Sequence, residues 1–304
     1  MERGAGTMAV VVTGAAGFVG DAVVTQLLRS GERVVGVDRL PVARRNWVRS
    51  IQADLNDRDP EVLAALRHAD AVIHLAGCPG VRDRRPDIAH RRRRDNVDAT
   101  RAVLADTPAV VPLVVVSSSS VYGGARFGRA SREDDPLQPM GGYAKSKVSA
   151  ERVCATRLDT GGPTVVARPF TAVGEGQRPD MALSRWVEAA RAGRPLRVLG
   201  GVHRTRDFTD VREVARAITA LLGSAGIVNV GTGRPRVLAQ AIEAVAAAVG
   251  VDPVVEVVPA ATDEVSDTWA DPSRLQQLTG LQLCTDLRDV AARIVGARRS
   301  EYVA

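Results

Sequence analysis

The residues best suited to chemistry are a tyrosine and a lysine in the stretch GGYAKSKVSAE (141–151). Tyr143 and Lys147 are four residues apart, so a helix would place both side chains on one face. A tyrosine hydroxyl is a weak acid, with an unperturbed pKa of about 10, and a neighbouring ammonium favours its ionised form. The spacing therefore predicts an acid–base pair in which Tyr143 transfers a proton and Lys147 assists it.

The lysine is informative because the chain otherwise uses arginine. Only two of the 41 basic residues are lysines, Lys145 and Lys147. A compact ammonium can approach a tyrosine and a ribose hydroxyl together, whereas the planar guanidinium suits that position poorly. The helical spacing assigns this role to Lys147 and directs Lys145 away from the active face.

A hydroxyl partner for the pair is expected in the stretch VVVSSSSVYG (114–123). Open α/β sheets bind ligands at the carboxyl ends of their strands, and four serines, 117–120, follow a predicted strand directly. A serine there would place a substrate oxygen against Tyr143. Without the tyrosine–lysine pair, a solvated serine turn would be the simpler interpretation.

The sequence TGAAGFVG places Gly14, Gly17 and Gly20 between a predicted strand and a predicted helix. This spacing is typical of a dinucleotide-binding turn, where the backbone approaches a diphosphate at a helix N-terminus. Asp38 ends the next predicted strand and would accept hydrogen bonds from ribose hydroxyls, which favours NAD over NADP. Arg39 offers a counter-charge to a 2′-phosphate, so NADP stays possible. A glycine-rich turn without a ligand is the alternative.

Two further segments are expected beside the dinucleotide. Asp54, in ADL (53–55), would lie near the adenine amine, and HLAG (74–77) would line the cofactor with small residues. We expect His74 itself to be a packed strand residue and not a catalyst.

Alternating strands and helices must position these residues. Valine-rich runs at 8–13, 33–38, 71–76, 109–117 and 163–168 predict buried strands, and the stretches between them carry apolar residues at helical spacing. This alternation predicts an α/β protein with a Rossmann-type doubly wound parallel sheet covered on both faces.

The pattern becomes less regular after Arg168, which indicates a smaller C-terminal α/β lobe. We expect a disordered lead-in over 1–7, a dinucleotide-binding Rossmann domain over 8–168, and a mainly substrate-binding lobe over 169–304. Some later elements should return to the first domain.

Composition and charge argue against several other classes. The net charge is +6, with a dense arginine cluster from Arg82 to Arg94, but only 3% of residues are aromatic, so nucleic acid is not an expected partner. There is no apolar run long enough for a bilayer and no signal peptide, so no membrane is expected. Three separated cysteines form neither a disulfide framework nor a metal signature. We expect a cytoplasmic protein without a metal.

In chain order, the motifs TGAAGFVG, HLAG, NVDAT, SSSSVYG, YAKSK, RPFTAVGEGQ, RDFTDV and NVGTG occur. From about residue 8 to 295, the chain resembles the extended short-chain dehydrogenases/reductases of the NAD-dependent epimerase/dehydratase family, which act mainly on nucleotide-diphosphate sugars. The resemblance implies Tyr143 as the acid–base, Lys147 as its partner and Ser118 as the catalytic hydroxyl. It also implies a homodimer formed through two helices per subunit.

The glycine loop and this resemblance together give two sets of expected ligand contacts. The cofactor contacts are Gly14, Gly17, Phe18, Val19, Gly20, Asp38, Arg39, Asp54, Leu55, Leu75, Ala76, Gly77, Asn96, Tyr143 and Lys147. The substrate contacts are Ser119, Ser120, Thr171 and Arg206.

The type of reaction follows less directly. Dehydratases of this family usually carry an Asp–Glu pair where this chain has Ser119 and Ser120, which argues against dehydration. A 4-ketoreductase and a 4-epimerase both need only the tyrosine, the lysine and a serine. Many epimerases of the family have an asparagine where this chain has Thr171 and a late anchoring arginine where it reads PAATDEV (259–265), while Arg206 is retained.

Because an epimerase depends on those anchors while its sugar turns over, we expect a ketoreductase acting on a nucleotide-diphosphate sugar, with the epimerase as the alternative. The missing anchors also leave open a substrate without a nucleotide diphosphate, such as a glycosylated or polyketide-type natural product. A non-catalytic dinucleotide sensor is less favoured, because it would not need the tyrosine–lysine pair.

Overall fold

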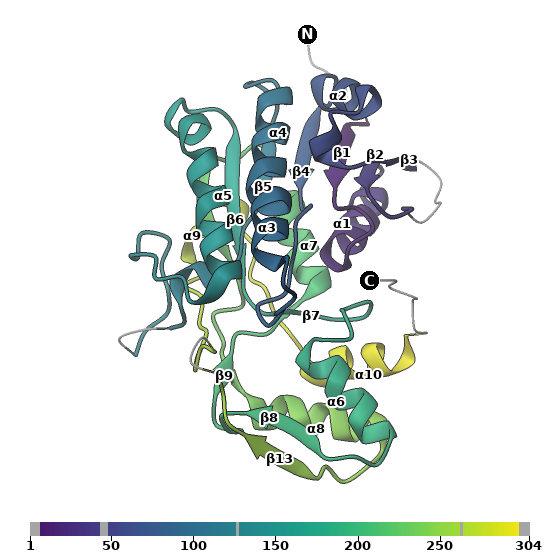
Figure 1. The fold of residues 1–304 in the computed structure, drawn as a ribbon, viewed down its shortest axis with the longest axis vertical. Helices are drawn as coiled ribbons and strands as arrows, with labels where there is room; N and C mark the ends of the chain where they lie inside the picture. Colours follow the sequence, from purple (N-terminus) through teal and green to yellow (C-terminus); the bar gives the residue numbers. More distant parts are fainter. Residues whose placement is uncertain (1–6, 43–47, 126–127, 262–263, 298–304) are drawn as a thin grey trace.

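The computed structural model describes residues 7–42, 48–125, 128–261 and 264–297. The expected lead-in over 1–7 therefore lies almost entirely outside the described residues. Two regions are visible in Figure 1, a large parallel sheet with its helices in the upper part and a smaller α/β lobe in the lower part.

Within the described residues, seven strands form the main sheet in the order β11-β6-β5-β4-β1-β2-β3. All neighbouring strands are parallel. The strands are β1 (Ala9–Thr13), β2 (Arg33–Asp38), β3 (Val48–Gln52), β4 (Ala71–His74), β5 (Leu113–Val116), β6 (Thr164–Pro169) and β11 (Gly226–Val230). The chain reverses its direction of winding between β1 and β4, which is the point where open parallel sheets bind ligands.

Helices cover both faces of this sheet, as its valine-rich strands require. On one face, α1 (Phe18–Arg29) and α7 (Val211–Ala220) pack with the sheet into one apolar core. On the other face, α2 (Pro60–Arg67), α4 (Ala99–Asp106) and α5 (Gly141–Asp159) form a second core. The Rossmann-type fold expected from the sequence is confirmed.

The smaller lobe has its own core of apolar side chains, among them Trp186, Val198 and Val245. Its elements are α6 (Ala182–Arg191), β8 (Leu196–Leu199), α8 (Leu238–Val249), β13 (Val255–Val258) and α10 (Leu287–Gly296). Strands β8 and β13 pair in parallel (Figure 1).

Short elements connect the two regions. Two-stranded pairs join β7 (Ala172–Val173) to β10 (Thr209–Asp210) and β9 (Thr205–Arg206) to β12 (Arg236–Val237). The remaining elements are η1 (Leu55–Asp57), α3 (Ile88–Arg92), the π-helical η2 (Arg93–Asp98), η3 (Ser119–Tyr122) and α9 (Ser273–Thr279). Among the described helices, none is long and apolar enough to cross a bilayer.

In the main sheet, the structure corrects the bounds of one expected strand and adds two strands. The strand expected over 109–117 begins at Leu113, because 108–111 form a turn in which the N–H of Val111 bonds the carbonyl of Pro108 and Val110 stays 82% exposed. The added strands β3 and β11 are the two edges of the main sheet. Strand β11 and helix α7 follow Arg168 in the chain, yet both belong to the main sheet layer.

Candidate functional site

The tyrosine–lysine pair lies on α5, beside the end of β5. The side chain of Lys147 is buried, and its Nζ donates a hydrogen bond to the carbonyl of Val116 at 2.9 Å. Within the described residues the ammonium makes this one hydrogen bond, and an ammonium has three N–H donors. Its other N–H groups can therefore bind a ligand. Tyr143 is partly exposed one turn earlier, whereas Lys145 is exposed to solvent. Lys147 is therefore buried beside β5 while Lys145 faces solvent, as the helical spacing predicts.

The serines after β5 form a compact turn. Ser118 accepts a hydrogen bond at its Oγ from the N–H of Ser120, 3.2 Å away, and η3 follows. Ser118, Ser119 and Ser120 are each partly buried, which argues against a fully solvated turn. The Oγ of Ser120 is buried and has no hydrogen-bond partner among the described residues. A buried hydroxyl without a partner is rare, and it is consistent with a position that a ligand completes.

The glycine loop between β1 and α1 leaves no room for side chains. Gly14 has a φ of +72°, and a Cβ there would lie 2.6 Å from the backbone nitrogen of Ala76. A Cβ on Gly20 would lie 2.0 Å from the carbonyl oxygen of Gly14. Gly17 is the N-cap of α1 and supplies no side chain, so the first N–H groups of the helix stay open to an anion. These contacts fit the close approach of a diphosphate.

Asp38 ends β2 next to this loop. Its carboxylate accepts one hydrogen bond from the N–H of Ala16 and one from the N–H of Leu40, each at 3.0 Å. These two bonds fix the carboxylate beside the glycine turn, where a ribose would meet it. The guanidinium of Arg39 pairs with Asp95 at 3.1 Å and lies 3.7 Å from Asp54. Because Arg39 already has acidic partners, it is less available to a 2′-phosphate.

Asp54 is more heavily engaged than the sequence indicates. It accepts hydrogen bonds from the N–H of Asn56 at 2.9 Å and from Arg94 at 2.7 Å. Burial opposes its ionisation, but these hydrogen bonds outweigh burial and lower the pKa of Asp54 below its ordinary value. The adenine contact expected of Asp54, and that of neighbouring Leu55, stay predictions.

Asn96 connects the end of β4 to α5. It lies in the π-helical segment η2, a helix form that is frequent at functional sites. Its Oδ1 accepts the N–H of Cys78 at 2.7 Å, and its Nδ2 donates to Ser146 Oγ at 2.8 Å. A Cβ on Gly77 would lie 2.5 Å from Asn96 Oδ1 and 3.6 Å from Lys147 Nζ. The loop 75–77 thus passes close to both residues, which fits a dinucleotide running along its backbone.

His74 is a packed strand residue, as expected. It is 2% exposed and lies between the hydroxyls of Thr13, 2.7 Å from Nδ1, and Thr100, 3.0 Å from Nε2. Burial, with a smaller contribution from the charge of Lys147, lowers the pKa of His74 to about 3. It is therefore neutral at physiological pH.

The expected substrate contacts Thr171 and Arg206 lie in the segments that join the two regions. Thr171 lies between β6 and β7, and its carbonyl accepts the N–H of Thr209 at 3.0 Å. Arg206 donates to the carbonyls of Val265 and Ser266 and pairs with Glu264 at 3.1 Å. Burial lowers the pKa of its guanidinium.

The arginine cluster expected between Arg82 and Arg94 is partly neutralised by acids. Arg82 pairs with Glu264, Arg85 with Asp83, Arg91 with Asp87, and Arg94 with Asp54 and Asp95. Arg92 is buried and donates to the carbonyl of Gly80 at 2.6 Å. Much of this cluster therefore connects neighbouring segments of the protein.

Sequence reasoning did not predict that Ser117, from the serine run, would form a buried polar cluster with Glu151 and Arg168. Their separation in the chain leaves no local pattern that would have revealed them.

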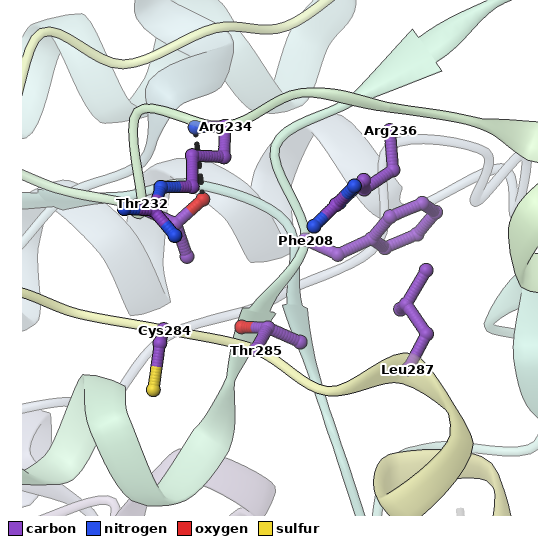
Figure 2. Close-up of a pocket in the computed structure, with 7 residues that line it drawn as sticks. All are labelled: Phe208, Thr232, Arg234, Arg236, Cys284, Thr285 and Leu287. Carbon is purple, nitrogen blue, oxygen red and sulfur yellow. Dashed lines mark hydrogen bonds between the residues drawn. The ribbon is translucent and has the colours of Figure 1, made fainter.

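A separate pocket lies between the end of β11 and the start of α10, and Figure 2 shows its lining. The residues are Phe208, Thr232, Arg234, Arg236, Cys284, Thr285 and Leu287. None of the residues expected at the cofactor or the substrate is among them, so this pocket is distinct from the candidate site.

Comparison with known proteins agrees with the fold. A sequence profile described as the NAD dependent epimerase/dehydratase family matches residues 10–231. The probable UDP-glucuronate 4-epimerase of Rhizobium meliloti (strain 1021) is 30% identical over 335 residues, which cover 95% of this chain and 96% of the relative.

Two solved structures are also similar. MoeE5 in complex with UDP-glucuronic acid and NAD is 35% identical, with a TM-score of 0.84 and coverage of 95% of this chain and 98% of that one. The UDP-glucuronic acid 4-epimerase from Bacillus cereus, in complex with UDP-glucuronic acid and NAD, is 27% identical, with a TM-score of 0.85 and the same 95% and 98% coverage.

Proposed function

Because this chain belongs to the NAD dependent epimerase/dehydratase family, we propose that it is an NAD-dependent 4-epimerase of a UDP-sugar, with UDP-glucuronate as the favoured substrate. The observation that carries the proposal is the position of Lys147, which lies on the same helix face as Tyr143, next to the end of β5 and to Gly77. The relatives described above act on or bind UDP-glucuronate. They favour the epimerase over the ketoreductase that the sequence alone preferred.

NAD would bind along the glycine loop, with its diphosphate at the N-terminus of α1 and a ribose at Asp38. The steric fit at Gly14 and Gly20 supports this position, and the ion pairs of Arg39 support NAD over NADP. When bound, NAD supplies a hydride acceptor that can return the hydride to the sugar.

Residues of the chain itself would transfer the proton. Tyr143 removes the proton of the C4 hydroxyl and later gives it back, and Lys147 favours the ionised tyrosine. Ser118 positions the sugar oxygen, and the unpartnered hydroxyl of Ser120 offers a further hydrogen bond to the substrate. Neither Ser119 nor Ser120 is an acid or base at neutral pH, which is why dehydration is not proposed.

Substrate anchoring involves the segments between the two regions. We propose that Arg206 and Thr171 contact the UDP-sugar, as the sequence predicts. Because Arg206 pairs with Glu264 here, binding a diphosphate at this guanidinium requires Glu264 to share it or move. The homodimer expected from the family resemblance also remains a proposal, which light scattering of the purified protein would test.

The experiment uses purified protein, UDP-glucuronate and no added cofactor. An epimerase returns its hydride in each turnover, so we expect bound NAD to be released on denaturation and the C4 epimer to form without added NADH. A reductase needs a 4-keto sugar and consumes one NADH or NADPH for each molecule reduced. No epimer from UDP-glucuronate, together with oxidation of added NADH or NADPH by a 4-keto sugar nucleotide, would therefore contradict the proposal.

A further inference from the structure

Behind the serine turn lies a cluster of polar side chains that the proposed chemistry does not use. Ser117, Tyr122, Glu151, Arg168 and Asn229 are 6%, 3%, 8%, 2% and 0% exposed. They come from the end of β5, from η3, from α5, from β6 and from β11. The cluster therefore connects the catalytic helix to three strands of the main sheet.

Glu151 is the centre of the cluster. Its Oε1 accepts hydrogen bonds from the hydroxyl of Ser117 and from Nε of Arg168, the latter at 3.0 Å. Its Oε2 accepts Nη2 of Arg168 at 2.7 Å, which makes the pair bidentate. Arg168 in turn donates from Nη1 to the hydroxyl of Tyr122 at 2.8 Å, and that hydroxyl bonds Asn229 Oδ1 at 2.7 Å.

Satisfied charges at this depth restrict geometry more than they stabilise the fold. A buried ion pair is often no more stabilising than apolar residues of the same volume, because both charges lose their hydration. Burial raises the pKa of Tyr122 to about 12, so its hydroxyl stays neutral and available as a donor. The hydrogen bonds of the cluster therefore favour the arrangement that the structure shows.

That arrangement fixes β5 against α5 at two consecutive residues. The carbonyl of Val116 accepts from Lys147, and the hydroxyl of Ser117 donates to Glu151, which lies one helical turn after Lys147. Ser118, the proposed catalytic hydroxyl, is the next residue. A displacement of about 1 Å in such a group can reduce turnover about 100-fold, so a shift at the two residues that precede Ser118 would be expected to affect turnover.

We propose that Glu151, acting through Ser117 and Arg168, is a positioning residue that sets the catalytic serine turn relative to the Tyr143–Lys147 helix. This inference rests on the proposed function for its catalytic readout, and on the structure alone for the position of the turn.

The first test is Ser117→Ala, because it removes one contact and leaves the bidentate Glu151–Arg168 pair intact. We expect turnover of UDP-glucuronate to fall about tenfold while KM changes less than about twofold. Ser117→Thr, which keeps the hydroxyl, should restore most of the turnover. The matched control is Ser149→Ala on α5, which should behave as wild type, because within the described residues the Ser149 hydroxyl bonds the carbonyl of Lys145 in its own helix.

A second measurement does not depend on catalysis. Hydrogen–deuterium exchange of peptides covering residues 117–122 should become faster in Ser117→Ala and stay unchanged in Ser149→Ala. If the wild-type protein shows no epimerisation, the proposed function fails. The difference in exchange between wild type and Ser117→Ala over residues 117–122 then still decides whether Glu151 positions the turn. Wild-type exchange and turnover in Ser117→Ala would overturn it.

Glu151→Gln extends the test, because glutamine keeps the shape but leaves the buried Arg168 without its counter-charge. A folded Glu151→Gln protein should show a lower kcat at a nearly constant KM, with faster exchange in 117–122. A folded variant with unchanged kcat and unchanged exchange would contradict the role assigned to Glu151. If this variant does not fold, the Ser117→Ala result decides.

Discussion

The ammonium of Lys147 lies 2.9 Å from the carbonyl oxygen of Val116, so the proposed catalytic helix directly contacts the end of the central strand β5. The same ammonium lies beside Gly77, at the end of β4. One cation therefore contacts the end of β5 and adjoins the loop that follows β4.

Lys147→Arg should reduce turnover by at least about 100-fold, because the planar guanidinium cannot occupy the buried site beside Gly77 and Val116 in the same way. Lys145→Arg is the matched control, since Lys145 is exposed on the same helix and should tolerate the change. Initial rates of both variants, with bound NAD measured after denaturation, provide the comparison. Equal activity of the two variants would remove Lys147 from the proposed site.

The glycine loop offers a second matched pair. Gly14 and Gly31 have φ values of +72° and +82°, but only Gly14 lies against other backbone, since nothing lies within 4 Å of a Cβ on Gly31. Gly31→Ala should therefore cost about 1 kcal/mol of unfolding free energy from backbone strain. Gly14→Ala should cost more and also abolish NAD binding, as measured by calorimetric titration. NAD affinity unaffected by Gly14→Ala would place the dinucleotide elsewhere.

Asp38 should determine the choice of cofactor. Asp38→Ser removes the carboxylate that would accept hydrogen bonds from the ribose hydroxyls and repel a 2′-phosphate. NAD affinity should therefore fall, and the ratio of NAD affinity to NADP affinity should decrease at least about tenfold. Parallel titrations with both cofactors measure this. The assignment fails if the preference is the same in wild type and variant.

His74 should make stability depend on pH. Its pKa is about 3 in the folded protein and about 6.5 when unfolded, so between these values the unfolded chain binds the extra proton. The free energy of unfolding that depends on neutral His74 is fully present above about pH 6.5. It falls as the pH decreases below that value, by up to about 1.4 kcal/mol per pH unit. Urea unfolding between pH 7.5 and 5 should therefore be less pH-dependent in His74→Gln than in wild type.

The control for that measurement is His68→Gln, because His68 is exposed on the surface and, within the described part of the chain, its ring bonds the carbonyl of Ala64 in the helix before it. This variant should keep the wild-type slope. Identical slopes for all three proteins would show that His74 is not the group responsible.

The sequence was most informative where local pattern determines structure. The glycine turn, the buried central strands and the four-residue spacing of Tyr143 and Lys147 each follow from neighbouring residues, and the structure has the expected elements there. The missed strands β3 and β11 are the sheet edges, and β3 has a single buried residue, Ile51, so its apolar pattern is weak.

Contacts between distant residues were not predictable in this way. The acidic partners of Arg39 and Arg82 come from other segments of the chain, and nothing in the local sequence indicates them. Similarly, Glu151 and Arg168 meet only because α5 packs beside β6. Such pairs depend on the tertiary arrangement, which the periodicity of single elements does not encode.

The proposed mechanism can be tested directly by following the epimerisation of UDP-glucuronate in D₂O, without added cofactor, by nuclear magnetic resonance. Oxidation and reduction at C4 return the original hydride, so we predict that UDP-galacturonate forms with no solvent deuterium on the sugar carbons, and that Tyr143→Phe loses most of this activity. Deuterium incorporated into the sugar ring, or full activity in Tyr143→Phe, would contradict the proposed mechanism.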